Sequence, residues 1–279
     1  MKVHSIETGK VAVHERQREG SGPGPLRLVN TLLDRSWTDR LPIYCWVIEH
    51  PEGLIVVDTG ETAHIAHPGY FPRWHPYFRF GVREWVEESE EAGPTLRRLG
   101  FDSTDVRWVV LTHLHTDHAG GLGHFPDSEI LVSRVELKKA SGALGKMRGF
   151  LPHRWPVWFQ PRQVDFPVRP FGPFPESLAL TNSGDVHLIP TPGHTHGHLS
   201  VAVEEGDNIL FFAGDTSYTE ELMLRGAVDG VSPDTSAAAL TLKRIRELAS
   251  QRPTVYLPAH DPASGERLAA RQATPAAGS

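Results

Sequence analysis

The sequence predicts an α/β fold, because short apolar segments rich in β-branched residues alternate along the chain with amphipathic helical ones. The chain has 279 residues, of which 39% are hydrophobic and 22% charged, which is enough for a sizeable core. Strand-rich stretches in both halves of the chain fit a layout of two sheets. We expect a single domain over residues 1–269 and a flexible tail, rich in Ala, Gly, Thr and Ser, at residues 270–279.

The first half of the chain is expected to begin its sheet with a hairpin. Residues 43–49 and 54–58 are apolar and β-branched, and a Pro-Glu-Gly turn at 51–53 separates them. The elements expected after it are a short helix, a buried strand, a further strand and a second short helix, at residues 95–99, 106–111, 129–133 and 135–140.

The second half continues the series of strands and ends with a longer helix. Pro233 suits the first position of an amphipathic helix that runs through Ala249, and Ser232 is its expected N-cap. The expected strands of this half lie at residues 185–190, 199–204, 208–213 and 254–257.

Two aromatic insertions interrupt this pattern, at about residues 64–86 and 142–176. Both are rich in Pro, Trp and Phe, a composition that fits core packing of irregular structure, a dimer surface or the wall of an apolar pocket. The insertion at 64–86 is accordingly a candidate surface for a homodimer. In the insertion at 142–176, Trp155 and Phe159 are the candidates for lining a substrate pocket.

Charge and cysteine content exclude several classes of protein. The net charge of −6 argues against nucleic acid or an anionic membrane as the main partner. The single cysteine, Cys45, excludes an internal disulfide framework and a Cys-based zinc ribbon. The apolar runs are too short to span a bilayer, and the opening residues lack the apolar stretch of a secretory signal, so we expect a cytoplasmic protein.

The strongest chemical signal is a histidine-rich segment directly after a predicted buried strand. Residues 112–121 read THLHTDHAGG. Where the chain stays extended, side chains alternate, so His113 and His115 point the same way and can share one metal ion. Asp117 and His118 follow where the chain turns toward a helix, and can therefore face a second ion.

Three further candidate ligands follow strands in the second half of the chain. His194, Asp215 and His260 each lie just beyond a predicted strand, where α/β sheets place ligand sites. A single histidine there would more often be a surface or core residue, but this many coincidences indicate a metal site. Neutral imidazole and carboxylate suit zinc and related divalent ions.

Together these residues resemble the dinuclear metal signature of the metallo-β-lactamase superfamily. The resemblance spans the chain from Val56 to His260. It implies an αβ/βα four-layer sandwich, with two central mixed β-sheets flanked by helices and the metals at one sheet edge. Position 115 is His and not the Glu of the diiron flavoprotein relatives, which favours two hydrolytic zinc ions over redox iron.

The resemblance also assigns the ligands. It implies that one ion is held by His113, His115 and His194, that the other is held by Asp117, His118 and His260, and that Asp215 bridges both.

Further residues are expected to support this centre. Asp58, in a Val-Asp-Thr-Gly turn, and His198 are candidates for orienting the ligands, since a metal-bound histidine usually needs a second partner. By its spacing from Asp215, Tyr218 could pack beneath the loop or donate a hydrogen bond to a substrate oxyanion. The segment from Asp215 to Thr219 resembles the N-acyl homoserine lactonase branch of the superfamily, in which a Tyr at this position assists lactone opening.

The expected activity follows from this resemblance. It implies a zinc-dependent hydrolase that opens the lactone ring of N-acyl homoserine lactones, a quorum-quenching reaction, by attack of a metal-bridging hydroxide. Asp117 would then move a proton to the leaving oxygen. Other readings stay open: a glyoxalase-II-like thioesterase, an arylesterase, an organophosphate hydrolase or a non-catalytic metal-binding protein. In every enzymatic reading, the partner is a small-molecule lactone or ester.

Overall fold

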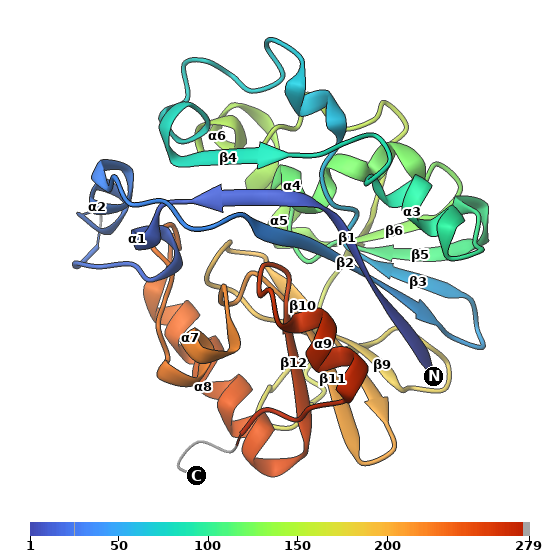
Figure 1. Ribbon diagram of the computed structural model, residues 1–279. Helices are drawn as coiled ribbons and strands as arrows, with labels where there is room; N and C mark the ends of the chain where they lie inside the picture. The colour runs from blue at the N-terminus through green and yellow to red at the C-terminus, as the bar shows by residue number, and fades with distance from the viewer. Residues whose placement is uncertain (25, 276–279) are drawn as a thin grey trace.

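Two β-sheets pack face to face in the computed structural model, which describes residues 1–24 and 26–275 (Figure 1). The first sheet has seven strands in the order β4-β1-β2-β3-β5-β6-β7, and the second has five in the order β12-β11-β10-β9-β8. The strands of the first sheet are β1 (Lys2–Val13), β2 (Leu41–Glu49), β3 (Leu54–Val57), β4 (Val82–Trp85), β5 (Val106–Val110), β6 (Glu129–Ser133) and β7 (Arg162–Val164). Those of the second are β8 (Leu178–Ala179), β9 (Val186–Pro190), β10 (Leu199–Glu205), β11 (Asn208–Gly214) and β12 (Thr254–Pro258).

Both sheets are mixed. The expected hairpin is confirmed, because β2 and β3 pair antiparallel with Trp46 opposite Val57. From β3 onward the first sheet is parallel through β5, β6 and β7. In the second sheet, β9, β10 and β11 are antiparallel, and β12 joins β11 in parallel. The parallel strands therefore deliver the loops that follow them to one edge of the molecule.

Alternation along the strands builds three apolar layers. In β3, Ile55 and Val57 face the second sheet, while Val56 faces the helices on the other side. In the second sheet, Leu210 and Phe212 meet the first sheet, and their neighbours on β11 pack against helices. Side chains that alternate between two buried faces require helices outside both sheets, so the expected αβ/βα sandwich is confirmed.

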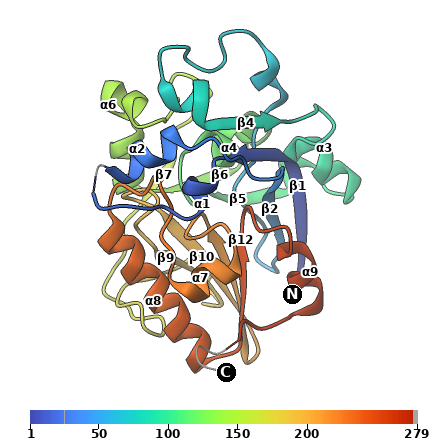
Figure 2. The same cartoon turned by 60° about the vertical axis from the view of Figure 1, so that its left-hand side comes forward.

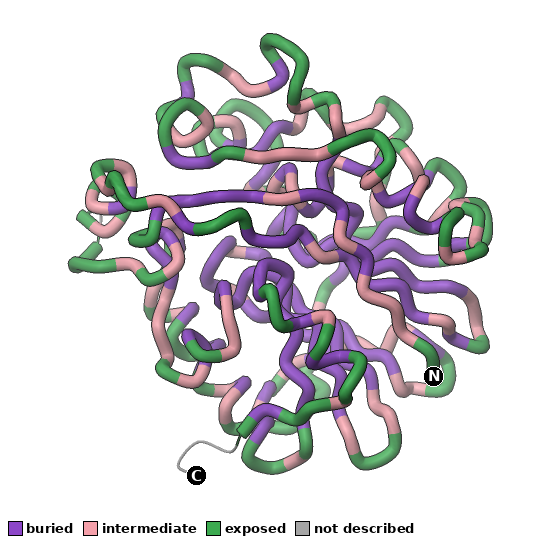
Figure 3. Tube along the Cα trace, in the orientation of Figure 1, coloured by how far each residue is buried: buried purple, intermediate pink, exposed green. Residues whose placement is uncertain are grey.

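Helices cover the outer faces of the two sheets, as Figure 2 shows from a second side. Helix α8 (Thr235–Gln251) lies along the outer face of the second sheet, where Leu242, Ile245 and Leu248 enter the core. Figure 3 shows that the strands form the buried interior and that exposed residues gather in loops and helix surfaces. The helices are α1 (Glu15–Arg18), α2 (Leu26–Leu33), α3 (Ala92–Arg98), α4 (Thr116–Ala119), α5 (Arg134–Ala140), α6 (Gly142–Met147), α7 (Glu220–Arg225), α8 (Thr235–Gln251) and α9 (Ser264–Ala270).

Short irregular helical turns complete the list of elements. Tyr77–Gly81 (η2) forms a π-helical turn directly before β4, a rare conformation that is frequent at functional sites. The 3-10 turns are η1 (Ala63–Ala66), η3 (Ser103–Asp105) and η4 (Gly120–His124).

The structure corrects two expectations about the second half of the chain. Helix α8 begins at Thr235 rather than at 233, because the side chain of Asp234 accepts the hydrogen bond from Ala237 N and acts as the N-cap. The expected cap, Ser232, instead donates its hydroxyl to Asp229 Oδ2 at 2.8 Å.

Both ends of the described chain pair with other parts of the fold. Strand β1 was not expected from the sequence, although it is the longest strand of the first sheet. In the expected tail, Thr274 N donates to Thr254 O at 2.8 Å, while residues 276–279 lie outside the described part of the chain. Within that described part, no helix is both long and apolar enough to cross a membrane.

Candidate metal centre and active-site pocket

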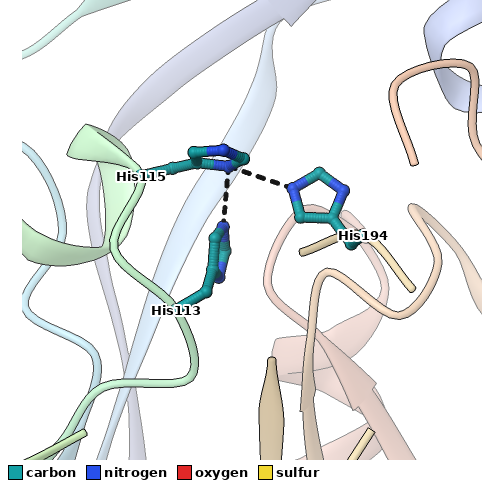
Figure 4. A group of neighbouring side chains, drawn as sticks. All are labelled: His113, His115 and His194. Carbon is teal, nitrogen blue, oxygen red and sulfur yellow. Dashed lines mark hydrogen bonds between the residues drawn. The ribbon is translucent and has the colours of Figure 1, made fainter. Parts of the chain in front are cut away.

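Three histidines from two loops converge in a first cluster (Figure 4). His113 and His115 follow β5, and His194 follows β9. His115 Nδ1 lies 3.0 Å from His113 Nε2 and 3.1 Å from His194 Nε2. Three ring nitrogens that face one point are the donor arrangement that a divalent transition-metal ion requires.

A second cluster lies beside the first. Asp117 and His118 sit on the short helix α4, and His260 follows β12. Asp117 Oδ2 is 3.4 Å from His260 Nε2 and 3.9 Å from His118 Nε2. The predicted turn toward a helix after His115 thus brings these side chains to a second common point.

Asp215 lies between the two clusters and divides its oxygens between them. Oδ1 is 3.3 Å from both His118 Nε2 and His260 Nε2, whereas Oδ2 is 3.5 Å from His194 Nε2. Among the described residues, Asp215 Oδ1 and His118 Nε2 are buried with no hydrogen-bond partner. Buried polar atoms are rarely left without one, so these two fit bonds to an ion. The donor set therefore fits metal binding, with Asp215 placed to serve both clusters.

Asp58, the candidate for orienting a ligand, contacts a histidine of the second cluster. Its Oδ2 lies 2.8 Å from His118 Nδ1 and accepts the Thr112 hydroxyl at 2.8 Å, while Oδ1 accepts Thr112 N at 2.7 Å. The left-handed backbone of Asp58, with φ of 61°, turns the carboxylate beneath the loop. When Nδ1–H of neutral His118 donates to Asp58, Nε2 carries the lone pair that can bind a metal.

Each of the other ligand loops has a comparable partner. His194 Nδ1 lies 3.1 Å from Asp229 Oδ2, and His260 Nδ1 lies 2.8 Å from the Pro42 carbonyl. His198 contacts both the His194 loop and Asp215: its Nδ1 lies 2.9 Å from the hydroxyl of Thr191, where that loop begins, and its Nε2 accepts from Asp215 N at 3.1 Å. Asp229 has no signal in the sequence, since it follows no strand and lies 35 residues from His194.

Glu136 joins the loops of the first cluster and was also missed. It is 1% exposed; Oε1 accepts Leu114 N at 3.1 Å, and Oε2 accepts the Thr195 hydroxyl at 2.7 Å and Gly197 N at 3.2 Å. A Cβ on Gly197 would lie 2.1 Å from Glu136 N, so only glycine fits there. One carboxylate on α5 thereby connects the 113–118 loop with the 194–198 loop.

Burial and neighbouring charged groups shift the pKa values of the candidate ligands. Burial disfavours the charged form of His260, but the carboxylates of Asp215 and Asp117 outweigh burial and raise its pKa to about 10. Burial and the neighbouring His194 lower the pKa of His115 to about 3, which keeps that ring neutral. Burial acts against the ionised form of Asp117, yet His118 and His260 hold its pKa down at about 2. Against burial, Asp229 raises the pKa of His194 in the first cluster as well. Only neutral imidazole and ionised carboxylate bind metal, so binding would release protons from His194 and His260.

A pocket of about 550 Å³ opens over both clusters. Tyr218 lines it together with Asp117 and Asp215, and its ring stacks on His260 with centroids 5.6 Å apart. Burial raises the pKa of Tyr218, so the phenol stays protonated and can donate a hydrogen bond. Its hydroxyl accepts from Gln17 Nε2 at 2.8 Å.

The two aromatic candidates for this pocket lie elsewhere. Trp155 lines a neighbouring cavity, and it packs with Phe159 against the core beside the first sheet. In the described part of the chain, the lining of the site pocket includes neither side chain, so this assignment is corrected. Both insertions do reach the pocket, but through other residues. Its apolar lining consists of Val11, Val13, Leu28, Leu32, Pro76, Tyr77, Phe78, Met147, Phe150, Val231 and Pro233.

Comparison with known proteins gives a family match over most of the chain. The sequence model of the Metallo-beta-lactamase superfamily matches residues 38–260, a span that contains every candidate ligand. An N-acyl homoserine lactonase of Bacillus thuringiensis subsp. kurstaki is 29% identical over 237 residues, which cover 84% of this chain and 86% of that protein.

Solved structures share the fold. An N-acyl homoserine lactone hydrolase, with the product N-hexanoyl-L-homoserine bound at its catalytic metal centre, superposes with a TM-score of 0.74. The alignment covers 96% of this chain and 95% of that one at 23% sequence identity. The dizinc quorum-quenching lactonase AidC, also in complex with a product, superposes with a TM-score of 0.65 at 15% identity, covering 95% of this chain and 90% of that one.

Proposed function

This chain belongs to the metallo-beta-lactamase superfamily, and from that membership we propose that it is a metal-dependent hydrolase that opens the lactone ring of N-acyl homoserine lactones. The observation that carries the proposal is Tyr218, a protonated phenol in the same pocket as two His/Asp clusters joined by Asp215. The relative with 29% identity that is named an N-acyl homoserine lactonase supports this substrate class.

We propose two Zn²⁺ ions as the cofactors. His113, His115 and His194 would hold one ion, Asp117, His118 and His260 the other, and Asp215 both. The mixture of imidazole and carboxylate donors is the chemistry that zinc prefers in hydrolytic sites. When bound, two such ions lower the pKa of water and polarise the carbonyl group that is attacked.

The protein's own residues supply the remaining steps. The Tyr218 hydroxyl donates to the lactone carbonyl oxygen, on which negative charge grows as the carbonyl carbon becomes tetrahedral. Asp117 stays ionised in the folded protein, so it can accept a proton and deliver it to the ring oxygen that leaves. The apolar wall around Phe78 and Val13 takes up the acyl chain and excludes water from it.

Lactone opening releases one acid group per turnover, so it can be followed as a fall in pH. The purified protein, with metal content measured, is expected to acidify a weakly buffered solution of N-hexanoyl-L-homoserine lactone. His113→Ala and Asp215→Ala should lose metal and turnover together, because each removes a ligand from a coupled site. His153→Ala is the matched control, since it removes an exposed histidine that belongs to neither cluster. Full metal content and activity in His113→Ala would contradict the ligand assignment.

The other hydrolases become outcomes of the same measurement. Turnover of a glutathione thioester, an aryl ester or a phosphotriester, with none of the lactone, would assign the corresponding alternative. Bound metal with turnover of none of these substrates would assign a non-catalytic metal-binding protein.

A homodimer through residues 64–86 stays a proposal. Trp74 and Phe80 are 62% and 54% exposed in this segment, as an unshielded apolar surface requires. Light scattering is expected to give the mass of a dimer for the wild type and of a monomer for Trp74→Ser. A monomeric wild type would exclude the dimer.

A further inference from the structure

Gln17 is a buried amide that the metal centre does not explain. It lies on α1 (Glu15–Arg18) and is 2% exposed. Its backbone is fixed on both sides, because Gln17 N donates to His14 O at 2.8 Å and Gly230 N donates to Gln17 O at 2.8 Å. Its side chain therefore enters the active-site pocket from a fixed point.

The amide nitrogen of Gln17 holds two phenols at once. Nε2 donates to the Tyr77 hydroxyl at 2.9 Å and to the Tyr218 hydroxyl at 2.8 Å. An amide group has two N–H donors, so both are used. A phenol oxygen that accepts from an amide cannot point its own hydrogen at the same nitrogen. Both O–H groups must therefore turn away from Gln17.

The free direction of both O–H groups lies toward the pocket. Tyr77, Tyr218 and Asp117 all line it, and among residues 1–24 and 26–275 neither phenol has an acceptor for its hydrogen. The amide oxygen of Gln17 is buried without a partner in that part of the chain. Rotating the amide would let this oxygen accept from both phenols, but it would leave two buried N–H donors without an acceptor in place of one such oxygen. Two donors that are fixed but have no acceptor fit a ligand with two acceptor oxygens.

We propose that Gln17 is a positioning residue that turns two phenolic O–H groups toward the substrate, and that Tyr77 is a second substrate hydrogen-bond donor. The inference rests on the proposed lactonase function. Tyr218, stacked on His260, lies on the metal side and donates to the lactone carbonyl. Tyr77, beside Phe78 on the apolar wall, donates to the second oxygen, which in this substrate class is the acyl amide carbonyl. The site thus selects lactones that carry an acylamino group.

The role of Tyr77 is tested with two substrates. Tyr77→Phe is expected to lower kcat/KM about tenfold on N-hexanoyl-L-homoserine lactone, since one hydrogen bond to the substrate is lost. It should leave kcat/KM unchanged on γ-butyrolactone, which has no acylamino group. Tyr218→Phe should lower kcat on both substrates. An equal loss on both substrates in Tyr77→Phe, or no loss on either, would overturn the assignment.

The role of Gln17 is tested by reversing the polarity of its side chain. A carboxyl group offers accepting oxygens where the amide offers N–H, so in Gln17→Glu at least one phenol must turn its hydrogen inward. The Raman tyrosine doublet reports whether a phenol accepts or donates. Difference spectra against Tyr77→Phe and Tyr218→Phe isolate the signals of these two tyrosines. Both phenols should accept a hydrogen bond in the wild type, and at least one should donate in Gln17→Glu. Gln251→Glu, at an exposed position on α8, should change nothing.

Kinetics complete the test of Gln17. Gln17→Met removes the two donors at similar length, and its loss of kcat should disappear in a Tyr77→Phe/Tyr218→Phe background, whereas a purely structural role would lower kcat in both backgrounds. Phenols that already donate in the wild type, with full turnover in Gln17→Glu, would overturn the proposal. A wild type that opens no lactone would overturn the proposed function instead, and the Raman comparison, which needs no substrate, would still decide the role of Gln17.

Discussion

Asp58→Asn is expected to weaken one metal site much more than the other. Asparagine tolerates the left-handed backbone at this position, so the turn is kept. Its single side-chain oxygen can still accept Thr112 N, as Asp58 Oδ1 does at 2.7 Å. The amide nitrogen then replaces the oxygen that lies 2.8 Å from His118 Nδ1.

This replacement changes the tautomer of His118. A donor opposite Nδ1 requires Nδ1 to accept, which moves the ring proton to Nε2. Nε2 is the atom that faces Asp215 Oδ1 at 3.3 Å and would bind the ion. Loss of such an outer partner typically lowers metal affinity 10–100-fold, which corresponds to about 1.4–2.7 kcal/mol. The first cluster should lose less affinity, because His194 is held by Asp229 and Asp58 reaches His113 only through the Thr112 hydroxyl.

The measurement is a competition titration with a chromogenic zinc chelator. The wild type should bind two equivalents of zinc, and Asp58→Asn should bind one of them 10–100-fold more weakly. Asp229→Asn is the matched variant, because it makes the same change behind His194 and should weaken the other equivalent. Unchanged affinity for both equivalents in Asp58→Asn, with the fold intact by circular dichroism, would refute the tautomer argument.

Three further outcomes are expected. Tyr218→Phe should lower kcat about 10–100-fold with metal content unchanged, because it removes one oxyanion donor while the metals still polarise the carbonyl; an unchanged kcat would remove Tyr218 from the mechanism. Phe78→Ala should lower affinity more for long acyl chains than for short ones, by up to about 0.8 kcal/mol per buried CH₂, whereas Trp155→Ala should show no such trend; a chain-length effect in Trp155→Ala alone would contradict the pocket assignment. Burial raises the pKa of Glu61 from 4.5 to about 7, so the folded protein keeps a proton that the unfolded chain releases. The free energy of unfolding should therefore fall by about 1–3 kcal/mol from pH 4.5 to 7, and urea titrations should find a smaller fall in Glu61→Gln.

The candidate ligands could be predicted because each occupies a position that the strand pattern defines. His113 and His194 follow apolar segments whose ends the sequence marks clearly, and parallel pairing brings such ends together. Their spacing also matched a family signature that tolerates low overall identity. Tyr77 lies in the insertion at 64–86, for which a pocket wall was one of three readings that composition left open. Strand β1 has no comparable pattern, so the part of the wall that it supplies was not predicted.

Partners of the ligands escaped prediction for a different physical reason. Asp229 and Glu136 are ordinary acidic residues in the sequence, and only the folded chain brings one to His194 and the other to Thr195. The aromatic candidates failed in the same way. Trp155 and Phe78 are both aromatic residues of aromatic-rich insertions, but they line different cavities. Composition predicts that such side chains pack, but it does not predict where.

The arrangement of these partners makes the metal centre a property of the whole sandwich. His118 depends on Asp58 after β3, His194 on Asp229 after α7, and Leu114 N on Glu136 of α5. Each ligand loop is thus oriented by an element distant in the chain, and the two sheets meet through Asp215, whose oxygens serve both clusters. Binding of metal must then stabilise the packing of the two sheets, because the unfolded chain cannot present these donors together. The same dependence places Gln17, at the start of the chain, against Tyr218 near its end, so the pocket forms only when both halves of the fold are in place.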